Sequence, residues 1–409
     1  MKTFSAKKIT GRVIIALLLV SAVYSFQACK QSDDSRKKVL KIYNWSDYID
    51  EDLLKEFPVW YKEQTGEDVK IVYQVFDMPE VMYTKIAMGK EDFDLTCPTQ
   101  YVIEKMLKND LLLPIDRNFG KTGSSLENIS PFLRGRMDAF SVPGKKAEDF
   151  MVPYMWGTSG ILYNTAKVSK DDVKSWACLW DPKYKGKILM KDHYWDVYNM
   201  AATYGFYDQI TSGKRTRYDV SNDHTDDDIA MVEKQLTALR PNLAGWEADF
   251  GKEMMTKGEV LMDYAWSGDA VWAIDEGKKV GVSLDYVVPN EGSNIWFDGW
   301  VIPKYARNVK AASYFLNYLC QAKIALRNME VSGYCSAVAT PEIIKAQSDS
   351  TITETTNLSY FFGPGNGKLH INPIQYPDSS VVDRCVLLHD FMDKNDKVLE
   401  MWSRVKGNK

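Results

Sequence analysis

The sequence predicts an α/β fold of two lobes that are joined by crossing segments and separated by a cleft. The body of about 380 residues that follows an N-terminal leader is longer than one hydrophobic core usually organises, so two domains are the default. Short apolar runs alternate with helical stretches from residue 39 onward. Extended passages at 151–164, at 296–303 and near Thr340 are suited to run between lobes. Several crossings allow the lobes to hinge about the cleft.

The first lobe begins with a regular alternation of strands and helices. Apolar spacing and turn residues predict strands at 39–42, 69–75 and 93–98, and helices at 51–64 and 79–88. Gly66 follows the first helix, as expected of a residue that adopts the left-handed conformation at a helix end. The run from Val260 to Ala265 predicts a further strand in the second half of the chain.

The acidic run from Asp219 to Asp228 is interpreted as the approach to a helix at 229–239. Acidic side chains at a helix start are favoured by the helix dipole. The run lacks the spaced oxygen ligands and the glycine of a calcium loop. We therefore expect neither a metal nor another cofactor in this protein.

Aromatic and acidic residues recur where predicted strands end. In open α/β sheets, ligands bind outside the carboxyl ends of the strands. Indole faces together with carboxylates suit an ammonium ligand. The clusters at strand ends are Trp45, Ser46, Asp47 and Tyr48; Thr99 and Tyr101; Trp266 and Asp269; and Trp296 and Asp298.

The same spacing of a tryptophan and an aspartate also occurs elsewhere in the chain. Trp246 with Asp249 and Trp272 with Asp275 fit it, and both pairs are interpreted as surface positions. Position at a strand end, rather than the spacing itself, therefore distinguishes the candidate clusters.

The first 28 residues predict export. Four basic residues precede an apolar stretch at 13–23, which is too short to span a bilayer. The sequence Phe26-Gln27-Ala28-Cys29 is similar to a bacterial lipoprotein signal, with Cys29 as the acylated first mature residue. Residues 29–38 are predicted to form a flexible tether. We expect a body in the periplasm or cell envelope that is held to the membrane by a lipid anchor alone.

Charge and cysteine content restrict the partners. Cleavage after residue 28 removes four basic and no acidic residues, which leaves 47 Lys and Arg against 55 Asp and Glu, a formal charge of −8. A negative body makes nucleic acid an unsuitable partner and favours encounter with cationic solutes. The remaining cysteines are predicted to be mostly buried free thiols, and they are Cys97, Cys178, Cys320, Cys335 and Cys385.

Taken in order, these motifs resemble the periplasmic spermidine/putrescine-binding proteins. The resemblance includes YNWSDYI at 43–49, Trp266-Ser267-Gly268-Asp269 and Trp296 to Asp298, and it extends from Val39 to the carboxyl end. It implies a type II periplasmic binding protein fold and a monomer. It also implies a polyamine ligand in the interlobe cleft and delivery to the permease subunits of an ABC importer. The implied lobes are 39–157 with 298–342, and 158–297 with 343–409.

The resemblance also assigns individual roles. Residues 45–48, Thr99 and Tyr101 would line the first lobe's face of the cleft, and Trp266, Trp296 and Asp298 the opposite face. Tyr334 would face the cleft near the third crossing. Asp269 matches the putrescine-preferring branch of the family, whereas Tyr101 and Trp296 match the spermidine-preferring branch.

Two positions depart from the family pattern. Asp196 stands where the family has Glu, so its carboxylate would be one methylene shorter and would need a water or a longer ligand. His193 stands where the spermidine branch has an acid, and a protonated histidine would repel an ammonium. The acids Asp47, Asp269 and Asp298 would lie at the two ends of a short diamine. We therefore expect that putrescine binds at least as well as spermidine.

Two other classes of function stay open on sequence grounds. Asp47 and Asp298 could act as the carboxylate pair of a glycosidase, but the surrounding rings are poorly suited to proton transfer. The chain could instead be a surface lipoprotein that binds a carbohydrate or another small solute. Sugar sites need many neutral hydroxyl and amide partners, however, and these clusters contain mainly acids.

Overall fold

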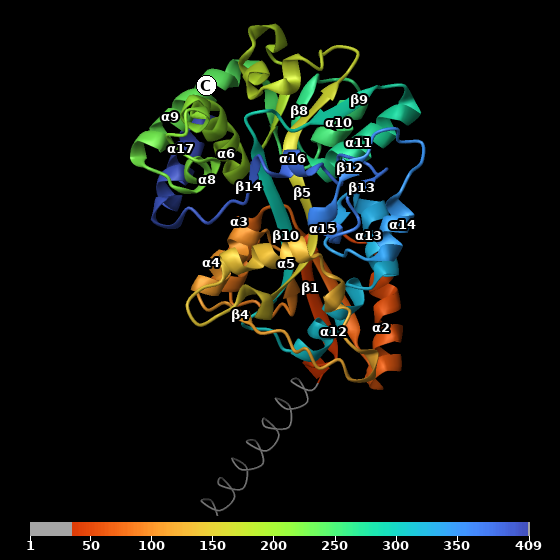
Figure 1. The fold of residues 1–409 in the computed structure, drawn as a ribbon. Helices are drawn as coiled ribbons and strands as arrows, with labels where there is room; N and C mark the ends of the chain where they lie inside the picture. Colours follow the sequence, from red (N-terminus) through yellow and green to blue (C-terminus); the bar gives the residue numbers. More distant parts are fainter. Residues whose placement is uncertain (1–34, 408–409) are drawn as a thin grey trace, which may run out of the picture.

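The computed structural model describes residues 35–407 of the chain. The predicted leader, the acylation site at Cys29 and residues 29–34 of the tether lie outside the described residues. The described chain forms two α/β lobes stacked one above the other (Figure 1), as the sequence predicts.

Two long strands run through both lobes and join them. Strand β5 (Met151–Asn164) and strand β10 (Ser293–Pro303) pair antiparallel and are buried along their whole length. Together they form the centre of one sheet with the strand order β2-β1-β3-β10-β5-β8-β6-β7. The predicted crossings at 151–164 and 296–303 are thus confirmed, and they cross Figure 1 as the yellow and teal strands between the lobes.

The lower lobe in Figure 1 contains parallel strands flanked by helices. Strand β1 pairs parallel with both β2 and β3, so the carboxyl ends of these strands meet at one edge. Helix α2 ends at Gly66, whose φ of 75° is the left-handed value expected from the sequence. The elements are β1 (Val39–Trp45), α2 (Asp52–Thr65), β2 (Lys70–Phe76), α3 (Pro79–Ala87), β3 (Leu95–Thr96), α4 (Gln100–Lys108), β4 (Leu112–Leu113), α5 (Pro131–Met137), α12 (Val309–Leu319) and α13 (Ala322–Ser332).

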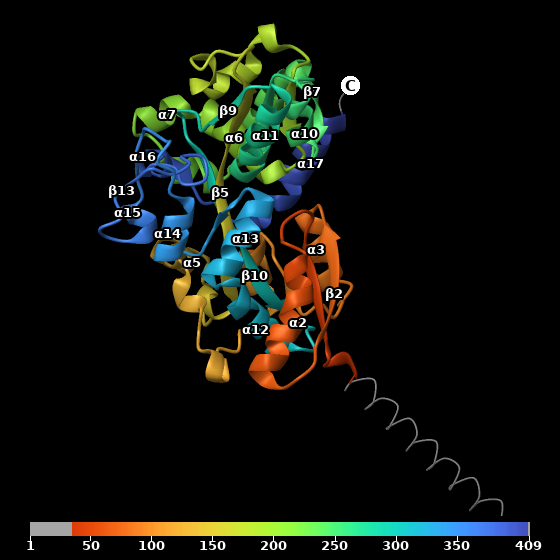
Figure 2. The same cartoon turned by 90° about the vertical axis from the view of Figure 1, so that its right-hand side faces the viewer.

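The upper lobe repeats the arrangement, with helices α10 and α11 on the side that Figure 2 turns toward the viewer. Its elements are β6 (Ile188–Lys191), α6 (Tyr194–Gly205), α7 (Tyr207–Thr211), α8 (Arg217–Asn222), α9 (Asp226–Leu239), β7 (Leu243–Glu247), α10 (Gly251–Thr256), β8 (Met262–Trp266), α11 (Ser267–Val280), β9 (Leu284–Val287) and α17 (Asn395–Gly407). Helix α9 begins within the acidic run, where Thr225 and Asp228 form a capping box. The run therefore caps helices, as the sequence indicates.

The C-terminal stretch crosses between lobes later than predicted. It contains β11 (Cys335–Ser336), α14 (Pro341–Gln347), β12 (Thr356–Asn357), α15 (Ser359–Phe362), β13 (Lys368–Leu369), α16 (Ser379–Val382) and β14 (Cys385–Val386). Ser130 Oγ, next to α5, donates to the carbonyl of Phe361 at 2.7 Å, so α15 lies against the first lobe. Strand β14 pairs with β10 at Ser293 and Asn294. The boundary predicted at 342 is therefore wrong, because residues up to α15 still pack on the first lobe.

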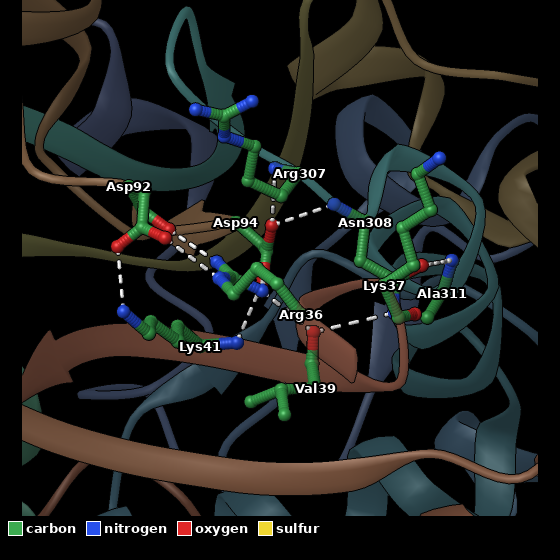
Figure 3. Close-up of polar contacts among 9 residues, drawn as sticks. All are labelled: Arg36, Lys37, Val39, Lys41, Asp92, Asp94, Arg307, Asn308 and Ala311. Atoms are coloured by element: carbon green, nitrogen blue, oxygen red, sulfur yellow. Dashed lines mark hydrogen bonds and ion pairs between the residues drawn. The ribbon is translucent and has the colours of Figure 1, made fainter. Parts of the chain in front are cut away.

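Part of the predicted tether is held by the first lobe (Figure 3). Buried Asp94 accepts hydrogen bonds from the Arg36 guanidinium at 3.0 Å and from the backbone N–H groups of Arg307 and Asn308 at 2.8 Å each. A carboxylate with this many donors links the segment just before β1 to the β10–α12 turn. Arg36, which falls inside the stretch 29–38 predicted to be flexible, is therefore fixed to the first lobe.

Apolar packing is continuous through the joining strands, and a second, smaller cluster lies within the upper lobe. The prediction of free thiols is confirmed: Cys97, Cys178, Cys320 and Cys335 are buried, and Cys385 is partly buried. Within residues 35–407, no helix has the length and apolar character needed to cross a membrane.

Candidate functional site

One cavity of about 770 Å³, mouth included, lies between the lobes. Every residue that the sequence predicts as ligand-binding lines it, although contact with a ligand stays a prediction. These residues are Trp45, Ser46, Asp47, Tyr48, Thr99, Tyr101, His193, Asp196, Trp266, Asp269, Trp296, Asp298 and Tyr334. Residues that sequence reasoning missed also line it, and they are Phe76, Asp77, Ala248, Asp249, Lys252 and Ser332.

The mouth of the cavity on the first lobe is formed by the ends of two parallel strands. Asp47 follows β1 with φ of 51°, a left-handed conformation that aspartate tolerates better than most residues. Ser46 Oγ donates to Asp77 Oδ1, just after β2, at 2.8 Å. Both carboxylates are exposed. The mouth is therefore acidic but open to water.

Aromatic rings from both lobes form a continuous wall. The ring centroids of Trp266 and Trp296 are 6.5 Å apart, those of Trp296 and Tyr334 5.4 Å, and those of Tyr334 and Tyr48 5.4 Å. Each contact is edge-to-face, which holds the rings in fixed orientations. Such a wall can enclose an alkyl chain and contact a cation.

Asp298 lies at an irregularity of the joining strands. Phe297 pairs with Trp156 but Gly299 pairs with Pro153, so Asp298 faces two residues of β5. A bulge of this kind redirects a side chain, here toward the cavity. Burial raises the pKa of Asp298 to about 7, although Thr99 and Tyr48 act to lower it. Its Oδ1 is buried without a hydrogen-bond partner among residues 35–407.

Asp196, by contrast, is already engaged by the protein. Its Oδ2 accepts from Trp266 Nε1 at 2.7 Å and lies 3.2 Å from His193 Nδ1, and its Oδ1 accepts from Asn294 Nδ2 at 2.8 Å. The shorter acid orients an indole of the aromatic wall. Asp196 thus has partners within the protein, and its contact with a ligand, directly or through a water, stays a prediction.

His193 links the two lobes through Tyr101. Its Nε2 lies 3.0 Å from the hydroxyl of Tyr101 on the opposite lobe. Burial lowers the pKa of His193, but Asp196 outweighs burial and leaves the pKa above its ordinary value. The imidazole thus serves the protein's own contacts and does not stand as an isolated charge facing a ligand.

The carboxylate of Asp269 also has partners within the protein. Its Oδ1 accepts from the hydroxyl of Tyr334 at 2.8 Å, and its Oδ2 lies 3.1 Å from the Nζ of Lys191. The sequence analysis did not identify Lys191 as part of the site. A lysine at the end of the apolar strand at 188–191 is the feature that could have indicated it.

Asp249 lies in a loop with a partly exposed side chain, as predicted for a surface position, but it also lines the cavity beside Lys252, whose Nζ lies 3.2 Å away. It follows β7, so the strand-end criterion applied to the other clusters would have found it. Asp275 is exposed and bonds to Lys278 on its own helix, as predicted for a surface residue.

Similar proteins are bacterial receptors for small solutes. The spermidine/putrescine-binding periplasmic protein of Escherichia coli is 29% identical over 319 residues, which cover 78% of this chain and 82% of that protein. The putrescine-binding periplasmic protein PotF of the same organism is 28% identical over 424 aligned residues and covers both chains fully. A crystal structure of the Streptococcus pneumoniae spermidine/putrescine ABC transporter substrate-binding protein PotD superposes with a TM-score of 0.66 at 28% identity. It covers 90% of this chain and 99% of that chain.

The family model described as bacterial extracellular solute-binding protein matches residues 60–353, which include both joining strands and most of the cavity wall. The matched region, the two-lobed fold and the interlobe cavity agree, and the chain belongs to the bacterial extracellular solute-binding protein family.

Proposed function

We propose that this protein is an extracytoplasmic receptor for polyamines that captures its ligand between the lobes and delivers it to an ABC importer. The observation that carries the proposal is Asp298, a buried carboxyl with a pKa of about 7 and an oxygen that has no hydrogen-bond partner among residues 35–407. A ligand ammonium would supply the missing partner and hold the carboxylate charged. The similar proteins named for spermidine and putrescine support the same ligand class.

The aromatic wall suits the alkyl part of such a ligand. Removing four methylene groups from water contributes about 3 kcal/mol, at about 0.8 kcal/mol each. Each cation–π contact adds roughly 0.5–2 kcal/mol. The carboxylate then sets where the amine lies, because a desolvated ammonium without a partner would be strongly unfavourable.

Membrane attachment through an acylated Cys29 is part of the proposal and rests on the sequence alone. A lipid anchor would hold the body beside the permease, and the ion-paired Arg36 marks where the tether joins the folded lobe. The protein is proposed to act as a monomer.

We expect polyamines to raise the melting temperature of the protein, because a ligand that binds only the native state stabilises it. Calorimetric titration with putrescine, cadaverine, spermidine and spermine would measure the affinity for each. The same titrations with neutral oligosaccharides serve as the comparison. Stabilisation by a sugar and by none of the amines would instead favour a carbohydrate receptor, and conversion of any ligand into product would indicate an enzyme.

A further inference from the structure

Lys191 occupies an environment with the features expected of a ligand ammonium. Its side chain is 1% exposed, and its Nζ lies 2.7 Å from Glu247 Oε1 and 3.1 Å from Asp269 Oδ2. The same nitrogen lies 4.3 Å from the ring centroid of Trp266, a residue of the cavity wall. A carboxylate and an indole face are thus both engaged by a cation that belongs to the protein.

We propose that Lys191 is a specificity-determining residue that fills one amine subsite of the cleft with an internal ammonium. The inference rests on the proposed function, and it specifies which amine of the ligand is buried. Asp269 and Trp266 are assigned to the protein's own cation, and Asp298 is the buried acid that takes an ammonium from the ligand.

The charges around Lys191 hold it in place. Asp263 is buried beside the same group, and burial together with Glu247 raises the pKa of Asp263 well above its ordinary value. Glu247 and Asp269 then provide the negative charge. Burial lowers the pKa of Lys191, but Glu247 and Asp269 outweigh burial and leave the pKa above its ordinary value, so the ammonium stays charged. Removing one partner of a buried ion pair is strongly unfavourable, so we expect Lys191 to stay when a ligand enters.

The second ammonium of a diamine must therefore face the mouth. The solvent-accessible acids of the cavity are Asp47 and Asp77, which are exposed, and Asp249, which is partly exposed and paired with Lys252. Exposed pairs contribute little because water screens them. The expectation that Asp47, Asp269 and Asp298 place acids at both ends of a short diamine is accordingly revised. One terminal amine is bound tightly, and the other is bound weakly.

The test compares putrescine with butylamine, which has the same carbon chain and one ammonium fewer. We expect the parent protein to prefer putrescine by less than about tenfold, the difference an exposed ion pair can supply. The variant Lys191→Ala with Glu247→Gln removes one positive and one negative charge and vacates the space beside Asp269. In this variant the preference for putrescine should rise by roughly tenfold or more, because the second ammonium can reach a buried acid.

The matched control is Lys191→Met with Glu247→Gln, which removes the same charges but keeps the space filled. Its preference should stay at the parent value. Calorimetric titration measures all affinities, and circular dichroism checks that each variant is folded.

A parent preference above tenfold would overturn the inference, and this measurement needs no variant. So would a folded Ala variant whose preference equals that of the Met control. If no amine bound the parent protein at all, the proposed function would fail first, so the two failures can be told apart.

Discussion

Replacing Asp298 by Asn is expected to weaken polyamine binding by at least about 100-fold at pH 8 while the protein stays folded. Loss of one partner from a buried charge pair costs about 3–5 kcal/mol, and each 1.4 kcal/mol is about a factor of ten. Asparagine keeps the shape of the side chain but cannot supply the negative charge. Calorimetric titration with putrescine measures the change.

Asp47→Asn is the matched control, because it removes an acid of the same size from the exposed mouth of the cavity. Screening by water limits its expected effect to roughly fivefold or less. Equal losses in the two variants would show that Asp298 is not the main ammonium partner.

The same substitution should stabilise the unliganded protein. The pKa of Asp298 is about 7 in the folded state against an ordinary value of 3.8, so the folded state binds the extra proton between about pH 4 and 7. Stability therefore declines as pH rises through this window, and the Asn variant lacks that decline. We expect the variant to melt above the parent at pH 8, with the difference disappearing near pH 4, as measured by scanning calorimetry.

Ligand affinity should change with pH in the opposite direction. Below about pH 7 the ligand competes with a proton on Asp298, so affinity falls by up to about tenfold per pH unit. The groups that influence Asp298 are Thr99, Tyr48, His193 and Asp196. Burial outweighs the lowering of the pKa of Asp298 by His193 and leaves it at about 7. Titrations from pH 8 to 5.5 would test this, and an affinity independent of pH in the parent would contradict it.

Replacing Gly268 by Ala is expected to lower ligand affinity by about 30-fold or more by preventing closure of the lobes. Gly268 lies in the first turn of α11, and a Cβ there would overlap the ring of Tyr334 on the opposite side of the cleft. Gly333 approaches from that side with φ of 75°, and a Cβ on it would lie 2.7 Å from the carbonyl oxygen of Gly268. The backbones at Gly268 and Gly333 thus approach so closely that a side chain on either residue would not fit.

This contact matters because it lies beside the interlobe hydrogen bond from Tyr334 to Asp269. A steric penalty of about 2 kcal/mol on the closed state reduces the population able to hold the ligand by roughly 30-fold, and apparent affinity falls by the same factor. Solution scattering should show ligand-induced compaction of the parent and little in the variant.

Gly135→Ala is the control, since a Cβ there meets nothing within 4 Å. It should bind and compact like the parent. A Gly268→Ala variant that binds normally and still compacts would show that closure does not need this contact.

Local patterns in the sequence were sufficient to predict most of the helices and strands and where the candidate site lies. Three examples are the alternation at 39–42, the glycine at 66 and the acidic run before α9. Each depends only on neighbouring residues, and each corresponds to the expected strand or helix. Because parallel strands bring their carboxyl ends to one edge, aromatic and acidic residues after separate strands could be expected to meet. They do line one cavity.

The third crossing could not be placed in this way. Whether α15 packs on the first or the second lobe depends on Ser130 and on the ring of Phe132, more than 200 residues earlier in the chain. A local pattern carries no information about such a partner.

By itself, the sequence determined the α/β class, the joining strands and the aromatic and acidic clusters at strand ends that line part of the cleft, because these follow from periodicity and from position at strand ends. Only the tertiary structure decided which acids are free to meet a ligand. Lys191 reaches Asp269 because β6 and β8 are neighbours in the sheet, which brings residues 78 positions apart within hydrogen-bond distance. Asp298 lies at an irregular pairing of β5 and β10, and within the described part of the chain one of its oxygens has no hydrogen-bond partner. The charge state of a buried acid depends on its partners in space, and strand order, which no local pattern specifies, sets those partners.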